Sequence, residues 1–195
     1  MGCTVIFDEN KMLADIRAHL GDYRFNHSLN VSASAKTLAE KYGGDADICY
    51  AAGLLHDVLK EQPRDEALEF FARNGIALTR LEMNAQKLWH AMAGAVYIKK
   101  NYPELPDEIA DAVRYHTTGK ADMTLTGKIL FTADFISADR DYPGVDDMRR
   151  RAEDSLESAM KEGLRFTVFE LSEKCVPIHP DTVDAYNFIL LNERK

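Results

Sequence analysis

The sequence predicts an all-α fold, built as a single domain that spans residues 1–195. Apolar residues recur at intervals of three and four over most of the chain, which is the period of an amphipathic helix. No two segments alternate apolar and polar residues in a way that predicts a convincing pair of strands. No linker rich in proline, glycine or serine divides the 195 residues, which are enough for one substantial core.

The helical period is clearest in five segments, which are separated by residues that end helices. These segments are Ile6 to Leu20, Val31 to Tyr42, Ile48 to Leu59, Ile109 to His116 and Leu125 to Ile136. The breaks include Gly43-Gly44, Gln62-Pro63, Asn74-Gly75, Tyr102-Pro103 and Thr118-Gly119. Asp45 is expected to cap the helix that carries His56 and Asp57, because its carboxylate accepts hydrogen bonds from the first free N–H groups.

Two further helices are expected toward the C-terminus. Asp146 to Arg165 predicts one long, exposed amphipathic helix whose main role is packing. Its apolar positions are Met148, Ala152, Leu156, Ala159 and Met160. After it, the polar stretch from Ile178 to Thr182 predicts the start of another helix, with Asp181 or Thr182 near its cap.

The charge and cysteine content restrict the partners and the compartment of the protein. Against 24 lysine and arginine residues stand 32 aspartate and glutamate residues, a formal net charge of −8 that argues against general affinity for nucleic acid or anionic membranes. The N-terminus lacks the features of a signal peptide, and no window approaches about 20 apolar residues. Cys3, Cys49 and Cys175 lie far apart without C-x-x-C spacing. We expect a cytoplasmic protein.

The most informative feature is the adjacent pair His56-Asp57 inside an apolar run from Ala51 to Leu59. Burying an ionised carboxylate among aliphatic side chains costs several kcal/mol unless hydrogen bonds or a cation compensate. A metal ion is the strongest such compensation.

Four other residues, His27, His90, His116 and Asp134, also have apolar or aromatic neighbours in the sequence. Any one of them alone is more often a hydrogen-bonded core residue than a metal ligand. Together with His56 and Asp57, they are many buried polar groups for a small domain to satisfy by ordinary pairing. A shared metal centre would satisfy them all.

These residues lie within phrases that resemble a known family. The phrases are Arg24-Phe25-Asn26-His27-Ser28, Gly53-Leu54-Leu55-His56-Asp57-Val58-Leu59-Lys60, Leu88-Trp89-His90-Ala91, Tyr115-His116-Thr117-Thr118-Gly119, Lys128 to Ile136 and Ile178-His179-Pro180-Asp181-Thr182. In this order they resemble the YqeK-type branch of the HD-domain superfamily of metal-dependent phosphohydrolases. The resemblance covers nearly the whole chain. It implies an HD-type helical bundle, with metal-binding phrases between residues 24 and 140 and C-terminal helices in 146–192 completing the site.

The resemblance also implies an activity and a set of ligands. Members of the branch are symmetrical bis(5′-nucleosyl)-tetraphosphatases, which cut diadenosine tetraphosphate into two ADP with metal-activated water, usually with iron. The implied iron ligands are His27, His56, Asp57 and Asp134. His90 and His116 are then ligands of a second ion, with Asp57 bridging, or contacts to phosphate. One or two ions fit this donor set, and manganese or zinc would suit it as well as iron.

An acidic chain that binds a tetraphosphate needs local cations and hydrogen-bond donors. Arg24, Lys60 and Arg140 are the expected cations, whereas Lys120 and Lys128 are as readily explained as surface charge. Thr117 offers a hydroxyl beside His116, and His179 and Thr182 belong to a region that closes over the nucleotide in the family. The expected catalytic residues are Asp57, Lys60, His90 and His116. Substrate contacts are expected from Arg24, Asp57, Lys60, His90, His116, Thr117, Arg140, His179 and Thr182.

The chain departs from the family pattern at Ser137, where many relatives have Glu, which affects a hydrogen bond to the ligands rather than the ligands themselves. Two alternative functions stay open, namely a (deoxy)nucleotide phosphatase of the same superfamily and a non-catalytic nucleotide-sensing HD module. Because all six His and Asp positions are filled, a purely structural role is disfavoured. A homodimer is an open alternative to a monomer, since the periodicity singles out no surface.

Overall fold

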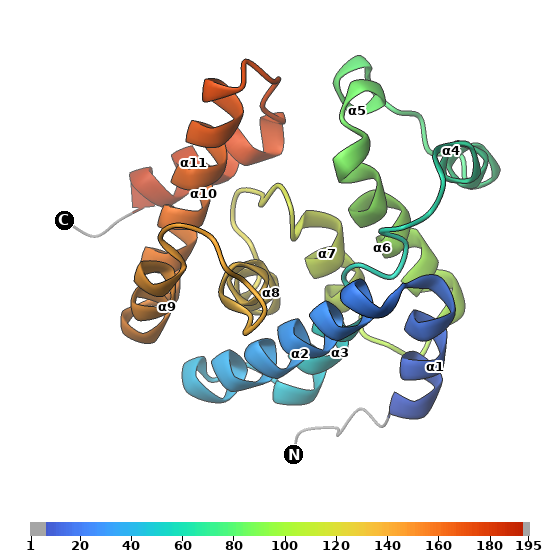
Figure 1. Cartoon of the computed structure of the whole chain (residues 1–195), viewed down its shortest axis with the longest axis horizontal. Helices are drawn as coiled ribbons and strands as arrows, with labels where there is room; N and C mark the ends of the chain where they lie inside the picture. Colours follow the sequence, from blue (N-terminus) through green and yellow to red (C-terminus); the bar gives the residue numbers. More distant parts are fainter. Residues whose placement is uncertain (1–6, 193–195) are drawn as a thin grey trace.

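The computed structural model describes residues 7–192, and its regular elements within this range are all helices (Figure 1). They are α1 (Glu9–His19), α2 (Asp22–Tyr42), α3 (Ala46–Leu55), α4 (Arg64–Arg73), α5 (Arg80–Asn84), the short 3-10 helix η1 (Gln86–Leu88), α6 (Trp89–Asn101), α7 (Asp107–Tyr115), α8 (Leu125–Ile136), α9 (Val145–Asp154), α10 (Leu156–Glu173) and α11 (Pro180–Asn192). The predicted all-α class is confirmed. Ile6, where the first predicted segment begins, and Cys3 lie outside the described residues.

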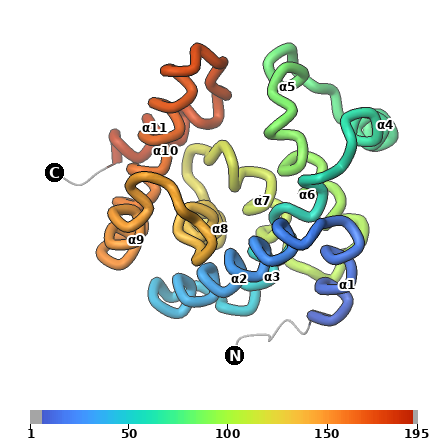
Figure 2. Tube along the Cα trace, in the orientation of Figure 1, coloured from blue at the N-terminus to red at the C-terminus, as the bar shows by residue number. Residues whose placement is uncertain are grey.

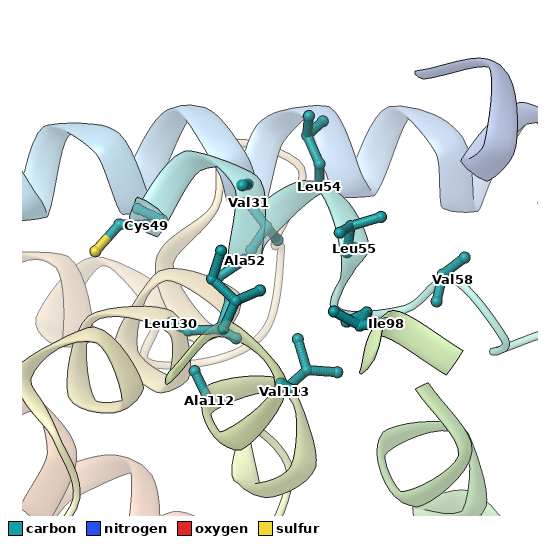
Figure 3. Packing of buried hydrophobic residues seen from close by; sticks show 14 of the residues in the cluster. Val31, Cys49, Ala52, Leu54, Leu55, Val58, Ile98, Ala112, Val113 and Leu130 are labelled. Atoms are coloured by element: carbon teal, nitrogen blue, oxygen red, sulfur yellow. The ribbon is translucent and has the colours of Figure 1, made fainter. Parts of the chain in front are cut away.

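Helices α2, α3, α7 and α8 form the centre of the molecule, and α6 packs against α7. Their apolar faces meet in a core that includes Val31, Leu54, Ile98, Val113 and Leu130, each at most 1% exposed (Figure 3). Burial of these aliphatic side chains is the main force that holds the central helices together.

Helices α2 and α3 approach very closely at Gly53. A Cβ atom at this position would lie 2.5 Å from the Cα atom of Ser32, which is a severe overlap with backbone. Glycine therefore permits the contact. The contact lies three residues before His56 and brings the end of α3 against the helix that carries His27.

The predicted helix from Ile48 to Leu59 is wrong at its end. Asp45 caps α3 as expected, accepting hydrogen bonds from the N–H groups of Asp47 and Ile48, but α3 ends at Leu55. The next residues form turns in which the Val58 N–H donates to the Leu55 carbonyl at 3.2 Å. His56 and Asp57 consequently lie in a turn at the end of a helix instead of in its interior.

The single helix predicted from Asp146 to Arg165 is also wrong, because the chain breaks between α9 and α10. Ser155 is extended, with φ −159°, and its side chain accepts a hydrogen bond from the Ser158 N–H at 3.2 Å, as a helix N-cap does. The packing role is confirmed, since all five predicted apolar positions are buried. The break lets α10 pack against α9, α8 and α11.

The C-terminal helices form a second, smaller apolar cluster beside the main core. Its buried members are Met123, Phe131, Met160, Leu164 and Ala185. Figure 2 shows α10 and α11 on one side of the central helices and α4 and α5 on the other. None of the helices in residues 7–192 combines the length and the apolar character that crossing a membrane requires.

Candidate metal centre

Four histidines from separate parts of the chain form a continuous row of buried rings. The ring centres of His27 and His56 are 5.2 Å apart, those of His56 and His116 are 5.1 Å apart, and those of His116 and His90 are 5.0 Å apart. Each neighbouring pair meets edge to face. The rings come from α2, the end of α3, the end of α7 and the start of α6.

The first group that could hold a metal ion consists of His27, His56 and Asp134. The Asp134 Oδ1 atom lies 3.1 Å from His27 Nε2 and 4.0 Å from His56 Nε2. Each of the three residues therefore offers one atom to a common point. Helix α8 supplies Asp134 from its last turn, next to the start of the loop that leads to α9.

The second group consists of His56, Asp57 and His116, so His56 belongs to both groups. The Asp57 carboxylate lies 3.6 Å from His56 Nε2 through Oδ2, and its Oδ1 lies 3.6 Å from His116 Nε2 and 3.1 Å from His90 Nε2. The structure thus brings all six predicted residues together. It places Asp57 between His56 and the pair His90 and His116.

A metal ion fits this site because two inward-facing atoms lack hydrogen-bond partners. Among the described residues, His56 Nε2 and Asp57 Oδ1 are buried and accept or donate no hydrogen bond. Such atoms are rare in native proteins, since leaving them unsatisfied costs about 1–3 kcal/mol each. Imidazole nitrogens and carboxylate oxygens are together ligands of iron, manganese or zinc.

The charge states of the site also suit a cation. Burial lowers the pKa of His56 to about 3 and that of His90 to about 4, so both imidazoles are neutral at pH 7. Burial alone would raise the pKa of Asp57, but the surrounding His56, His116 and His90 hold it well below its ordinary value. The pKa of Asp134 is likewise lowered despite burial, by His27 and Arg140. The carboxylates are therefore ionised.

Hydrogen bonds donated by Nδ1 orient three of the imidazoles. His56 Nδ1 donates to the Gly53 carbonyl and His116 Nδ1 donates to the Val113 carbonyl, both at 2.7 Å. Because a carbonyl only accepts, the proton must lie on Nδ1, which leaves the Nε2 lone pair for a ligand. His27 Nδ1 lies 2.7 Å from Oδ2 of Asp139.

Asp139 is a residue that the sequence reasoning missed. It lies in the loop between α8 and α9, where no helical period draws attention to it. Its one signal in the sequence is its position as a further carboxylate beside Arg140 and soon after Asp134. Ser137 stands where many relatives have Glu, a change that affects a hydrogen bond to the metal ligands. Asp139 provides such a hydrogen bond to His27.

All three predicted cations lie at the metal centre. Arg24 Nη1 is 3.2 Å from Asp57 Oδ2, so Arg24 reaches Asp57 from α2. Lys60 Nζ lies 3.4 Å from Asp57 Oδ1 and 3.0 Å from His90 Nε2. Arg140 donates to both the carboxylate and the carbonyl of Asp134. About a quarter of each cationic side chain is exposed, so an anion from solvent can reach it.

The remaining predicted substrate contacts, Thr117, His179 and Thr182, differ in burial and in the groups that they contact. The Thr117 hydroxyl is buried beside His116 without a partner among the described residues. His179 lies 3.6 Å from Glu82 of α5, and its Nδ1 accepts a hydrogen bond from the Asp181 N–H. His179 therefore caps α11, and Asp181 and Thr182 lie in the first turn, near the cap as predicted. Thr182 is buried in the first turn of that helix.

Lys120 and Lys128, which had an ordinary surface explanation, each pair with a neighbouring acid. Lys120 lies 2.8 Å from Asp111, and Lys128 lies 3.2 Å from Glu157. The acids in these two ion pairs do not belong to the metal centre.

A cavity of about 270 Å³ adjoins the centre on the side of Lys60 and His90. Its lining residues are Leu59, Lys60, Gln62, Ala67, Gln86, Lys87, Trp89 and His90. The Gln62 side-chain oxygen is buried and has no hydrogen-bond partner in residues 7–192. The cavity therefore combines an apolar wall with amide and cationic groups, next to a candidate ligand.

A comparison with protein families identifies this arrangement, since the model of the HD domain matches residues 24–139. The chain belongs to the HD-domain family. The matched segment begins at Arg24 and ends at Asp139, so it contains all six residues of the metal centre.

Relatives within the HD-domain family cover almost the entire chain. A protein of Bacillus subtilis named "Bis(5'-nucleosyl)-tetraphosphatase, symmetrical" is 34% identical over 183 residues, which are 94% of this chain and 98% of the relative. A protein of the same name from Staphylococcus aureus is 34% identical over 171 residues, 87% of this chain and 88% of the relative. The resemblance found in the sequence phrases is therefore confirmed.

The HD-domain fold is also confirmed by a solved structure. The crystal structure of a protein from Clostridium acetobutylicum, described as a predicted HD superfamily hydrolase involved in NAD metabolism, matches with a TM-score of 0.92. It is 29% identical, and the match covers 96% of this chain and 100% of that chain. The C-terminal helices thus belong to the shared arrangement.

Proposed function

We propose that this HD-domain protein hydrolyses diadenosine tetraphosphate symmetrically, releasing two ADP. The observation that carries the proposal is the convergence of six His and Asp residues with Arg24, Lys60 and Arg140 at one buried site. The donor set suits a divalent metal, and the three cations suit a substrate with several phosphates. The names of the relatives, which match along nearly the whole chain, supply the particular substrate.

In this proposal, His27, His56, Asp57 and Asp134 bind an iron ion, and manganese or zinc would fit the same donors. His90 and His116 would either hold a second ion, which Asp57 would share, or contact phosphate oxygens. A divalent metal here would supply Lewis-acid polarisation of a phosphoryl oxygen and activation of water.

The protein's own side chains would hold the polyphosphate against this centre. Arg24 and Lys60 now pair with Asp57, and Arg140 pairs with Asp134. Substrate phosphates would share these cations and neutralise the charge that develops during cleavage, an effect commonly worth a few kcal/mol. The Thr117 hydroxyl, which lacks a partner among the described residues, would donate a hydrogen bond to a phosphate oxygen.

The nucleosides need space beside the metal centre. We place one of them in the cavity next to Lys60 and His90, where Gln62 has an unpaired oxygen for a base amino group. His179 and Thr182, at the start of α11, would contact the other part of the substrate. Within a single domain over residues 1–195, the helices of 146–192 would thereby complete the site.

The test is to incubate iron-loaded protein with diadenosine tetraphosphate under anaerobic conditions and to separate the products by anion exchange. Asp57→Ala should reduce turnover at least 100-fold because Asp57 contacts the histidines on both sides of it. Asp107→Asn is the control, since Asp107 is exposed and its ion pair within residues 7–192 is with Lys99.

ADP as the sole product would support the proposal. A mixture of ATP and AMP would place the attack elsewhere on the chain of phosphates. Turnover of deoxynucleoside monophosphates without cleavage of the tetraphosphate would favour the phosphatase alternative. Full activity of Asp57→Ala would overturn the assignment of the site.

A further inference from the structure

His27 differs from the other oriented histidines in the group that holds its Nδ1 atom. His56 and His116 each donate to a backbone carbonyl three residues earlier in their own segment. His27 instead contacts a carboxylate, Oδ2 of Asp139, across 112 positions of sequence. The contact distance is 2.7 Å, and the His27 side chain is fully buried, so the contact is shielded from solvent.

Asp139 accepts this hydrogen bond as an anion. The carboxyl group of an aspartate is ionised at neutral pH. An ionised carboxylate only accepts, so the proton of the contact lies on Nδ1 of His27. His27 Nε2 faces Asp134 Oδ1 across 3.1 Å, and a metal ion held by these two residues would bind the Nε2 lone pair.

The loop that carries Asp139 holds two candidate ligands from different helices. Asp139 contacts His27 of α2, and the adjacent Arg140 donates to Asp134 of α8. A backbone carbonyl would be sufficient to orient an imidazole, as His56 and His116 show. A carboxylate adds negative charge, which makes the imidazole a stronger donor to a metal.

From this geometry we propose that Asp139 is a positioning residue that fixes the orientation of His27 and strengthens its bond to the metal. The inference rests on the proposed metal centre but does not depend on the identity of the substrate. It assigns Asp139 a role through His27 instead of direct contact with substrate.

The experiment compares the metal affinity of four proteins, the wild type, Asp139→Ala, Asp139→Asn and Asp141→Asn. Competition with a chelator for Co²⁺ or anaerobic Fe²⁺ measures the affinity without any substrate. Asp139→Ala should bind metal about 10–100-fold more weakly. Asp139→Asn should lose less metal affinity, since its amide oxygen still accepts the hydrogen bond from His27. Asp141, exposed in the same loop, provides the matched control, which should bind like the wild type.

A second measurement uses the metal-free proteins and does not involve affinity. Long-range ¹H–¹⁵N spectra of the imidazoles should show His27 with its proton on Nδ1 in the wild type and in Asp139→Asn. In Asp139→Ala the fixed tautomer should be lost, while the signals of His56 and His116 keep theirs. Unchanged affinity and an unchanged His27 tautomer in Asp139→Ala would overturn the inference.

The outcome is distinguishable from failure of the proposed function. A wild-type protein that binds metal but leaves diadenosine tetraphosphate intact would contradict the activity and leave the role of Asp139 standing. A wild-type protein that binds none of the metals would overturn both. If Asp139→Ala does not fold, the metal affinity of Asp139→Asn is compared with that of the wild type. Weaker binding by Asp139→Asn supports the inference, and equal binding overturns it.

Discussion

His56 and Asp57 show how the properties of two neighbouring residues depend on the atoms around them. Each is at most 1% exposed, yet His56 Nε2 and Asp57 Oδ1 have no hydrogen-bond partner within the described chain. Burial keeps the imidazole neutral, whereas the carboxylate lies beside the cations Arg24 and Lys60, at 3.2 and 3.4 Å, and keeps its charge. Two adjacent residues thus offer opposite kinds of donor, one neutral and one anionic, to the same space.

The metal-free protein should lose stability when the pH falls from 7.5 to 5. The pKa values of His56 and His90 are lowered by burial to about 3 and about 4, whereas those of an unfolded chain are about 6.5. Between these values the unfolded state binds more protons, so the free energy of unfolding falls as the pH falls. Urea unfolding at the two pH values measures this change. The drop should be smaller for His56→Gln, and a midpoint that rises on acidification would contradict the burial of neutral imidazoles.

At the scale of elements, the loop between α8 and α9 contacts two candidate metal ligands, His27 of α2 and Asp134 of α8. The Arg149 side chain of α9 holds this loop by donating to the carbonyls of Ile136, Ser137 and Arg140 at 3.0–3.2 Å. A hydrogen bond from a charged guanidinium to a carbonyl is stronger than one between neutral groups. A single guanidinium therefore fixes the segment from which Asp139 and Arg140 reach the metal centre.

Replacing Arg149 with Met should weaken both the fold and the metal site. The loss of three hydrogen bonds to loop carbonyls should lower the free energy of unfolding by about 1–3 kcal/mol. It should also reduce metal affinity several-fold, because the loop would hold His27 and Asp134 less firmly. Urea unfolding and chelator competition measure the two effects. Arg150→Met is the control, since Arg150 is exposed and its ion pair among the described residues is with Asp147 on the same helix. Equal behaviour of the two variants would contradict this role of the loop.

At the scale of the whole molecule, the sequence predicts the all-α class and the residues that converge, because both follow from apolar surroundings. It does not predict where α3 ends, since the apolar run continues through Leu59 while the turn after Leu55 is decided by packing. The amphipathic pattern continues on both sides of Ser155, so the pattern alone does not predict that Ser155 is the N-cap of a new helix. Asp139 is missed because its partner is 112 positions away and a loop has no period.

Removal of metal should lower the thermal stability of the whole protein. A ligand that binds only the native state at 100 times its dissociation constant adds about 2.7 kcal/mol to the free energy of unfolding. For a chain of 195 residues this corresponds to a change in Tm of roughly 5–10 °C. Differential scanning calorimetry of the Fe²⁺-loaded protein before and after chelation measures the change. Asp57→Ala should show little change, and an equal shift in that variant would contradict the role of Asp57.

The shared position of His56 has a consequence for stoichiometry. An imidazole has two nitrogens, and Nδ1 of His56 already donates its proton to the Gly53 carbonyl. Only the lone pair of Nε2 is left to bind a metal ion, although His56 belongs to both of the groups that could hold one. Both groups therefore cannot be complete at once, and each chain that carries two ions must complete the second with His90 and His116 instead. Titration should accordingly give one strong equivalent per chain, and a second only at a weaker, separately resolved step.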